Sequence, residues 1–291
     1  MTAALELDHV SRDFTTPDGR GYRALDDISI AITDGSFVAI VGPSGCGKST
    51  LLNITAGLLA PSAGAVRVDG EPLAGINRRA TYMFQQDALL PWKTVRGNVA
   101  LGLTLGGMAK ADAHARADEW LERVGLAAFA AHYPAQLSGG MRKRAIMAQN
   151  WIIDRGILLM DEPFSALDVH TRLRMEMELL ELWDGSGSSR TLPERAPAAS
   201  VASGFSQTSR KTVVFVTHDL EEAIALADEV VVLSAGPAAH VVARHPVTLE
   251  RPRDLMELRT APAFVELYRA IWAVLREEVI KSQRTAVDGH R

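Results

Sequence analysis

The sequence predicts an α/β fold with a largely parallel sheet flanked by helices. Two observations support this prediction. Short apolar runs typical of strands alternate with helix-like stretches, and a glycine-rich loop joins one such strand to a helix. Between residues 86 and 155 the pattern shows several helices and no convincing strand. We interpret this stretch as a helical insertion in the α/β core.

The individual elements follow from the spacing of apolar residues. The expected strands are 5–10, 28–32, 37–41, 65–68, 81–84, 157–160, 212–216 and 229–233, and the expected helices include 51–59, 111–124 and 139–152. One apolar face of a C-terminal helix is formed by Phe264, Leu267, Tyr268, Ile271, Leu275 and Val279. We expect this face to pack on the chain's own core, and a partner or regulatory surface is the alternative.

Composition limits the class of protein. The chain has 291 residues, enough to bury a sizeable core as one domain with a subdomain or as two small domains. A net charge of −4 and the lack of a polybasic tail argue against nucleic acid as an obligatory partner. The single cysteine, Cys46, excludes an internal disulfide and favours a reducing compartment. Without a membrane-length apolar run or a signal-peptide pattern, the chain is expected to be cytoplasmic.

A phosphate-binding loop follows the predicted strand 37–41 and precedes the helix-like stretch 51–59. The residues that fit the pattern G-x-x-x-x-G-K-[ST], with the one that follows it, are Gly42, Pro43, Ser44, Gly45, Cys46, Gly47, Lys48, Ser49 and Thr50. Glycines let backbone N–H groups turn towards a polyphosphate, Lys48 adds a positive charge near the β- and γ-phosphates, and Ser49 can ligate Mg²⁺. The alternative is a glycine-rich turn without a ligand, but the flanking strand and helix favour phosphate binding.

Two acids, Asp161 and Glu162, end the apolar run 157–160. In a protein with a phosphate-binding loop, the first acid is the expected partner of Mg²⁺, and the second can reach the water that attacks the γ-phosphate. A strand that ends in two acids is weak support alone. It gains weight from the loop upstream.

A serine and two glycines, Ser138, Gly139 and Gly140, precede the helix-like stretch 139–152. Ser138 could simply be the N-cap of that helix. The same arrangement also presents a hydroxyl, unobstructed N–H groups and a helix N-terminus, which together bind anions.

Taken together and in order, these motifs resemble the ATP-binding subunit of ABC transporters, and the resemblance covers nearly the whole chain. The markers are the phosphate loop, Phe84-Gln85-Gln86-Asp87, Leu137-Ser138-Gly139-Gly140-Met141, Asp161-Glu162, Ser165-Ala166-Leu167-Asp168 and Val216-Thr217-His218-Asp219. The resemblance implies a P-loop NTPase (RecA-like) core with an antiparallel β subdomain and an inserted α-helical subdomain.

The resemblance also implies a division of the chain. Residues 1–85 and 156–245 would form the ATPase core, 86–155 the helical subdomain with the signature motif, and 246–291 a C-terminal helical extension. Residues 184–210, rich in Ser, Ala, Gly and Pro, are expected to be a disordered insertion within the core.

By the same resemblance, ATP and Mg²⁺ would be bound in a homodimer. Two copies would face head to tail, each ATP lying between the phosphate loop of one copy and Ser138, Gly139 and Gly140 of the other. The implied catalytic residues are Glu162 as general base, His218 on the γ-phosphate and on Glu162, and Gln85. Ser49, Gln85 and Asp161 would lie at Mg²⁺, and Asp168 at the opposite subunit's phosphate loop.

Phe14 is the expected adenine-stacking residue. Tyr22 is the alternative because residues 15–22 look like an insertion, and Phe14 as ordinary core filling stays open.

Softer markers resemble the nitrate, sulfonate, taurine and thiamine-precursor importer branch: Leu89-Leu90-Pro91-Trp92, Met141, and Arg251-Pro252-Arg253-Asp254. The chain departs from the family pattern at Lys143, where Gln is usual, at Gln149-Asn150 in place of Arg-Ala, and at Ser165 in place of a common Gly. None of these departures removes a group that touches phosphate or metal.

We therefore predict a Mg²⁺-dependent ATPase subunit of a bacterial importer for a small nutrient, peripheral at the cytoplasmic face of the cell membrane. Its partners would be transmembrane permease subunits and, indirectly, a periplasmic or lipid-anchored solute-binding protein. We expect the apolar segment 89–92 to dock on the permease, and folding of Trp92 onto the helical subdomain is the alternative. The rival functions are a cassette ATPase of DNA repair or translation, a regulatory module without turnover, and an exporter subunit.

Overall fold

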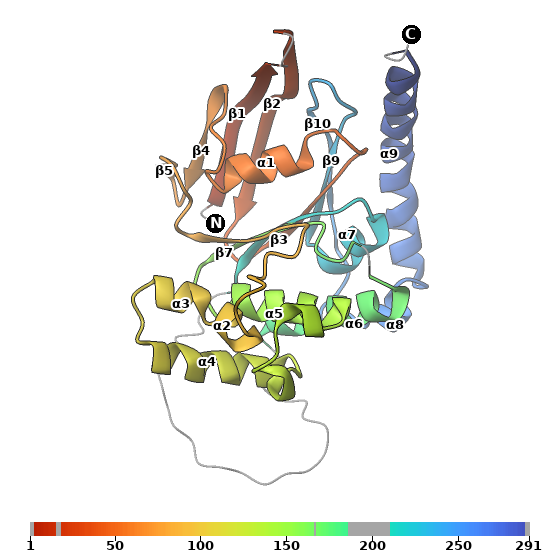
Figure 1. The fold of residues 1–291 in the computed structure, drawn as a ribbon. Helices are drawn as coiled ribbons and strands as arrows, with labels where there is room; N and C mark the ends of the chain where they lie inside the picture. Colours follow the sequence, from red (N-terminus) through yellow and green to blue (C-terminus); the bar gives the residue numbers. More distant parts are fainter. Residues whose placement is uncertain (1–2, 16–18, 166, 186–209, 289–291) are drawn as a thin grey trace.

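The computed structural model describes residues 3–15, 19–165, 167–185 and 210–288 of the chain. Within these ranges the strands form a six-stranded sheet, in the order β10-β9-β3-β8-β7-β6, and a four-stranded sheet, in the order β2-β1-β4-β5. Helix α1 (Lys48–Thr55) lies between the two sheets, the other helices cover the far side of the larger sheet, and the last helix runs along one side of the molecule (Figure 1).

The six-stranded sheet is parallel except at one edge. Its strands are β3 (Phe37–Val41), β6 (Ala80–Met83), β7 (Ile157–Asp161), β8 (Thr212–Val216), β9 (Glu229–Leu233) and β10 (Val241–Pro246). Every residue of β3, β7 and β8 is buried, as expected for parallel strands covered on both faces. Successive residues face opposite sides, so the apolar runs serve two cores. The predicted α/β fold with a parallel sheet is confirmed.

The four-stranded sheet is antiparallel and forms the second layer. It consists of β1 (Ala3–Thr15), β2 (Gly21–Thr33), β4 (Ala63–Val68) and β5 (Glu71–Pro72). Strands β1 and β2 are longer than the expected 5–10 and 28–32, because polar residues continue the pairing beyond the apolar run. Arg23 in β2, for example, donates from Nε to Asp13 Oδ1 in β1 at 2.7 Å. Strands β5 and β10 were not expected, because neither carries a buried apolar run.

The helical layer under the large sheet is built from the stretch in which we expected helices. It contains α2 (Val95–Val99), α3 (Leu101–Leu105), α4 (Lys110–Arg123), the 3-10 turns η1 (Ala127–Phe129) and η2 (Pro134–Gln136), and α5 (Gly139–Trp151). The buried residues of α4 are Ala113, Ala117 and Leu121, which are spaced by four along one face. The exact subdomain boundaries stay a prediction.

The remaining helices lie between and after the last strands of the large sheet. They are α6 (Val169–Asp184), α7 (Leu220–Leu226), α8 (Leu255–Leu258) and α9 (Pro262–Asp288). In α9, Phe264, Ile271 and Leu275 are buried in the same core as the large sheet, so the predicted apolar face packs on the chain itself. Of the expected insertion 184–210, residues 186–209 lie outside the described ranges. In the described part of the chain, no helix has both the length and the apolarity to cross a membrane.

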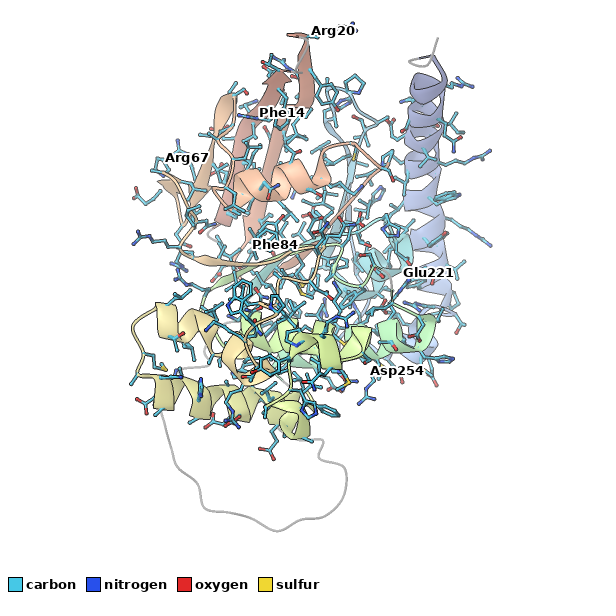
Figure 2. All side chains as sticks on the ribbon, viewed as in Figure 1. Phe14, Arg20, Arg67, Phe84, Glu221 and Asp254 are labelled. Atoms are coloured by element: carbon cyan, nitrogen blue, oxygen red, sulfur yellow. The ribbon has the colours of Figure 1, made fainter. Side chains whose placement is uncertain are left out.

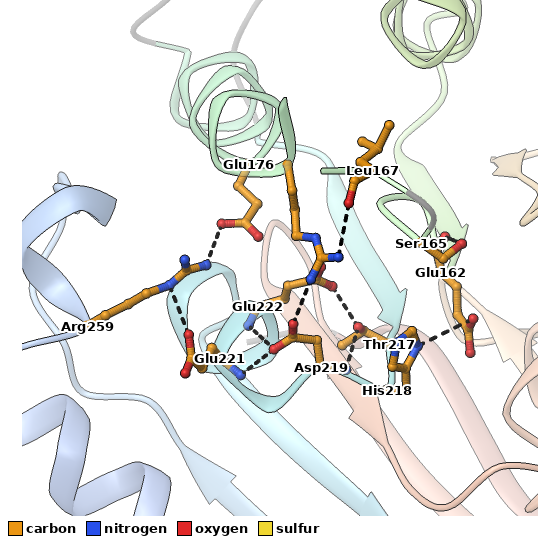
Figure 3. A network of polar contacts seen from close by, with 11 residues as sticks. Glu162, Ser165, Leu167, Glu176, Thr217, His218, Asp219, Glu221, Glu222 and Arg259 are labelled. Carbon is orange, nitrogen blue, oxygen red and sulfur yellow. Dashed lines mark hydrogen bonds and ion pairs between the residues drawn. The ribbon is translucent and has the colours of Figure 1, made fainter. Parts of the chain in front are cut away.

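A buried glutamate joins the C-terminal segment to this core. Glu176 in α6 is fully buried and accepts a hydrogen bond from Arg259 Nη2 at 2.9 Å, while Arg259 Nε lies 3.5 Å from Glu221 Oε2 in α7 (Figure 3). Burial raises the pKa of Glu176 to about 7, although the charge of Arg259 opposes the shift. The Glu176 side chain therefore binds its proton more strongly in the folded than in the unfolded chain.

The raised pKa predicts that the Glu176→Gln variant gains stability relative to wild type as the pH rises. A carboxyl with a raised pKa contributes stability below its ordinary value of 4.5, and that stability is lost as the pH rises through about 7. Gln cannot ionise, so between pH 4.5 and about pH 8 the variant should gain on the order of 3 kcal/mol in unfolding free energy relative to wild type. Urea unfolding across this range measures the effect. The control is Glu257→Gln at an exposed site of α8, and an equal gain in both variants would contradict the prediction.

Candidate functional site

The phosphate loop connects β3 to α1 in a compact turn. Gly47 caps α1 in the left-handed conformation, with φ of 94°, and a Cβ there would lie 2.7 Å from Leu25 Cδ2. Any other residue at position 47 would be strained and crowded. The Lys48 side chain curls over the loop, donating from Nζ to the carbonyl oxygens of Gly42 at 2.8 Å and Pro43 at 3.0 Å. The predicted residues 42–50 thus form one cradle.

Cys46 lies within this cradle but points into the core. Its side chain is buried, and burial raises the pKa of the thiol. The Cys46 side chain therefore supports the loop by packing.

Asp161 ends β7 beside the phosphate loop. Its Oδ1 atom is buried, and among the described residues it has no hydrogen-bond partner. Burial raises the pKa of Asp161, a hydrogen bond from Ser49 lowers it, and the negative charge of Glu162 raises it further. A buried carboxylate oxygen without a partner, close to the hydroxyl of Ser49, is a suitable ligand for a hard cation such as Mg²⁺.

Glu162 follows in an unusual backbone conformation, with φ of 45°. Its N–H donates to the carbonyl oxygen of Val216 at 2.8 Å, which fastens the end of β7 to the end of β8. The carboxylate is held from two sides. Gln85 Nε2 donates to Oε2 at 2.9 Å. His218 Nδ1 lies 3.5 Å from the same oxygen, as Figure 3 shows. The structure therefore brings together three residues that the sequence analysis proposed as catalytic.

The loop that carries His218 is fixed by a polar network at the start of α7. Thr217 Oγ1 donates to Glu222 Oε2 at 2.7 Å, and Asp219 accepts from the N–H groups of Glu221 and Glu222 (Figure 3). Arg172 in α6 donates to Asp219 Oδ2 at 3.0 Å and to the carbonyl oxygen of Leu167 at 3.2 Å. The network thus joins the His218 loop to the segment that precedes Asp168.

Sequence reasoning missed Arg172 and Glu222. Neither belongs to a recognisable motif. The available signal was their spacing from a helix N-cap: Arg172 stands four residues after Asp168, and Glu222 three residues after Asp219.

Ser138 and Asp168 each cap a helix. Ser138 accepts from the Met141 N–H at 3.3 Å at the start of α5, and Asp168 accepts from the Thr171 N–H at 3.0 Å at the start of α6. The hydrogen bond with Thr171 lowers the pKa of Asp168. The N-cap alternative for Ser138 is therefore real, and its hydroxyl also stays exposed at the helix N-terminus, together with Gly139.

The signature helix and the phosphate loop lie on opposite faces of the six-stranded sheet. Helix α1 packs in one core with Val38 and Ile40 of β3, whereas α5 packs in the other with Phe37 and Ala39. Figure 1 shows α1 on one side of β3 and α5 on the other. Two halves of the predicted ATP site are thus kept apart within one chain.

Two aromatic side chains flank the antiparallel sheet near the loop. Phe14, labelled in Figure 2, is half-buried, and the Arg12 guanidinium lies 4.6 Å from its ring centroid. Its cross-strand partner is Tyr22, which is 38% exposed. A Cβ added to Gly236 would lie 3.7 Å from the Tyr22 hydroxyl and 3.3 Å from the carbonyl oxygen of Gly45. Tyr22 thus lies close to the phosphate loop, although the sequence analysis placed it second to Phe14 for stacking on adenine.

The apolar segment after Gln85 splits into a buried and an exposed part. Leu89 is buried in the helical core, whereas Trp92 is 71% exposed. The expectation that all four apolar side chains of 89–92 need a covering partner is therefore wrong for Leu89. Trp92 does not fold onto the helical layer, so that alternative is not supported.

Known proteins resemble this chain in sequence and in fold. The family described as ABC transporter matches residues 25–165. An uncharacterized ABC transporter ATP-binding protein of Methanocaldococcus jannaschii is 39% identical over 97% of this chain and 95% of its own length. The taurine import ATP-binding protein TauB of Yersinia pestis is 42% identical over 75% of this chain and 76% of its length. The nitrate import ATP-binding protein NrtC of Synechococcus elongatus is 36% identical over 96% of this chain, which covers 39% of that longer protein.

Solved structures agree with these relatives. A dimeric ATP-binding cassette in a post-hydrolysis state, bound to ADP and Pi, superimposes with a TM-score of 0.68 at 30% identity, covering 84% of this chain and all of the other. From the ordered motifs, the fold and these relatives, we conclude that the chain belongs to the ABC transporter family, as an ATP-binding subunit with the P-loop NTPase fold of a transport ATPase.

Proposed function

We propose that this subunit hydrolyses ATP with Glu162 as general base, and that a homodimer of it drives a bacterial importer for a small nutrient of the nitrate, sulfonate or taurine class. The observation that carries the proposal is the Glu162 carboxylate, held by Gln85 and His218 at the sheet edge where the phosphate loop begins. The taurine and nitrate import relatives support the nutrient class.

In this proposal the polar groups of the site bind the phosphates, position the base and hold the metal ion. Backbone N–H groups of the loop and the Lys48 ammonium bind the phosphates. Glu162 accepts the proton of the attacking water, and His218 and Gln85 hold its carboxylate in position. The residues fit Mg²⁺, because Asp161 offers a buried oxygen without a described partner. Ser49, Gln85 and Asp161 would hold the ion, which when bound neutralises charge on the phosphates.

We further infer that each site needs a second copy of the chain. Ser138, Gly139 and Gly140 cannot meet the phosphate loop of their own chain across the buried sheet. The solved relative with ADP and Pi is dimeric, which supports head-to-tail pairing. Asp168 would then contact the partner's phosphate loop, and Phe14 or Tyr22 would stack on adenine.

We place the subunit at the cytoplasmic face of the membrane, bound to permease subunits. A solute-binding protein would deliver the solute to that permease. The exposed Trp92 side chain is the proposed anchor for the permease, because a large exposed aromatic residue is a common centre of binding energy. It lies in the same loop as Gln85, so the docking residue and the side chain that holds the Glu162 carboxylate share one segment.

The Glu162→Gln variant tests the catalytic role. It keeps the shape of the side chain but removes the base, so phosphate release should slow by roughly 10² to 10⁴-fold while ATP affinity is kept. Lys48→Ala is the matched contrast, because it should weaken nucleotide binding itself. Release of phosphate by Glu162→Gln at a near wild-type rate would rule out the proposed base.

The Trp92→Ala variant tests the docking role. Because Trp92 is 71% exposed, its loss should change unfolding stability by less than about 0.5 kcal/mol. Permease binding, measured with the isolated permease in detergent, should weaken by about 30-fold or more. Leu105→Ala is the control, because Leu105 is also exposed in the helical layer. Normal permease binding by Trp92→Ala would contradict the proposal.

A further inference from the structure

A buried lysine connects the signature helix to the loop of Gln85. Lys143 lies in α5, and its side chain is only 8% exposed. Its Nζ donates to the carbonyl oxygen of Gln85 at 3.1 Å and lies 3.1 Å from Asp87 Oδ1. A lysine is rarely buried unless it is paired, so these two contacts explain its position.

The neighbouring arginine strengthens the same connection. Arg142 donates from Nε to Asp87 Oδ2 at 2.9 Å and from Nη1 to the carbonyl oxygen of Leu137 at 2.7 Å. Partial burial alone would raise the pKa of Asp87, but the hydrogen bonds from Arg142 and Lys143 outweigh it, and the pKa is lowered. Asp87 is therefore a carboxylate clamped by two cations of one helix.

The clamped loop has no regular structure of its own. Residues 84–90 form neither helix nor strand between β6 and α2. Gln85 nevertheless has to hold its amide at 2.9 Å from Glu162 Oε2. A side chain on an irregular loop keeps such a position only if the loop backbone is fixed elsewhere.

We propose that Lys143 is a positioning residue for hydrolysis. Its ammonium fixes the backbone of Gln85 and, with Arg142, the carboxylate of Asp87, so that the Gln85 amide stays on Glu162. Because Lys143 stands in the helix that begins after Ser138, the Lys143 anchor makes α5 and the Gln85–Glu162 pair move as one unit. This inference rests on the proposed role of Glu162.

The anchor is tested first by hydrogen exchange on the full chain, without nucleotide. In Lys143→Met the amides of residues 84–89 should exchange about tenfold faster than in wild type, because this part of the loop opens more often. Lys143→Arg keeps a donor cation and should stay close to wild type. The control is Arg144→Met on the same helix, whose Nη1 donates to the carbonyl oxygen of Val124 at 3.3 Å rather than to the loop. It should leave exchange at 84–89 unchanged.

Kinetics then tests positioning. In Lys143→Met, kcat for ATP should fall about tenfold with KM changed less than about twofold, since Lys143 touches the loop and not the phosphate cradle. Asp87→Asn should have a similar effect, and the double variant should lose less than the product of the two single effects, because the contact between Lys143 and Asp87 is lost in both.

The outcomes separate the two proposals. Wild-type exchange at 84–89 in Lys143→Met, or equal changes in Arg144→Met, would overturn the anchor whatever the turnover. Turnover that survives Glu162→Gln would overturn the proposed base instead, and the exchange result would still decide the role of Lys143.

Discussion

The parallel pairing of β3, β8 and β7 is the constraint on which the site depends. In the register of this sheet, Ile40 and Asp161 both stand opposite Val216, so the three strands end at one level. The chain leaves these ends as the phosphate loop, Glu162 and Thr217. Parallel strands present their carboxyl ends at the same edge, and ligands of open α/β sheets bind there. Three segments far apart in sequence meet because their strands are buried side by side.

The same sheet also keeps the signature loop apart from the phosphate loop of its own chain. Its strands are apolar on both faces, so α1 and the antiparallel sheet cover one face and the helical layer covers the other. Polar loops cannot cross this core without losing their hydrogen bonds. The signature loop is therefore directed away from its own phosphate loop and is available to a second chain. In this account dimerisation is a consequence of the buried sheet, and the polar contacts of Lys143 and Arg172 join helices α5 and α6 to the loops that carry Gln85 and His218.

Much of this could be predicted from the sequence, because the strongest signals are local. The apolar runs predicted both ends of β3, β8 and β9 correctly. The phosphate loop and the pair Asp161-Glu162 could be recognised because each directly follows a predicted strand. The outer parts of β1 and β2 escaped prediction because their pairing depends on cross-strand polar contacts such as Arg23 with Asp13. Lys143 and Arg172 were not predicted as functional residues because their partners Gln85 and Asp219 are distant in sequence. Glu222 was not predicted because its contact with Thr217 depends on the conformation of the loop before α7. The burial of Leu89 beside the exposed Trp92 also depends on tertiary packing that a row of apolar letters does not reveal.

The most direct test of the account mixes two inactive chains. One carries Lys48→Ala, which damages the phosphate loop, and the other carries Ser138→Arg, which blocks the signature loop. Each variant alone should have little ATPase activity. In a mixed dimer, one site receives both defects and the other receives none, so mixing should restore a substantial part of the wild-type rate of phosphate release. A mixture as inactive as its components, although mixed dimers form, would contradict a site shared between two chains.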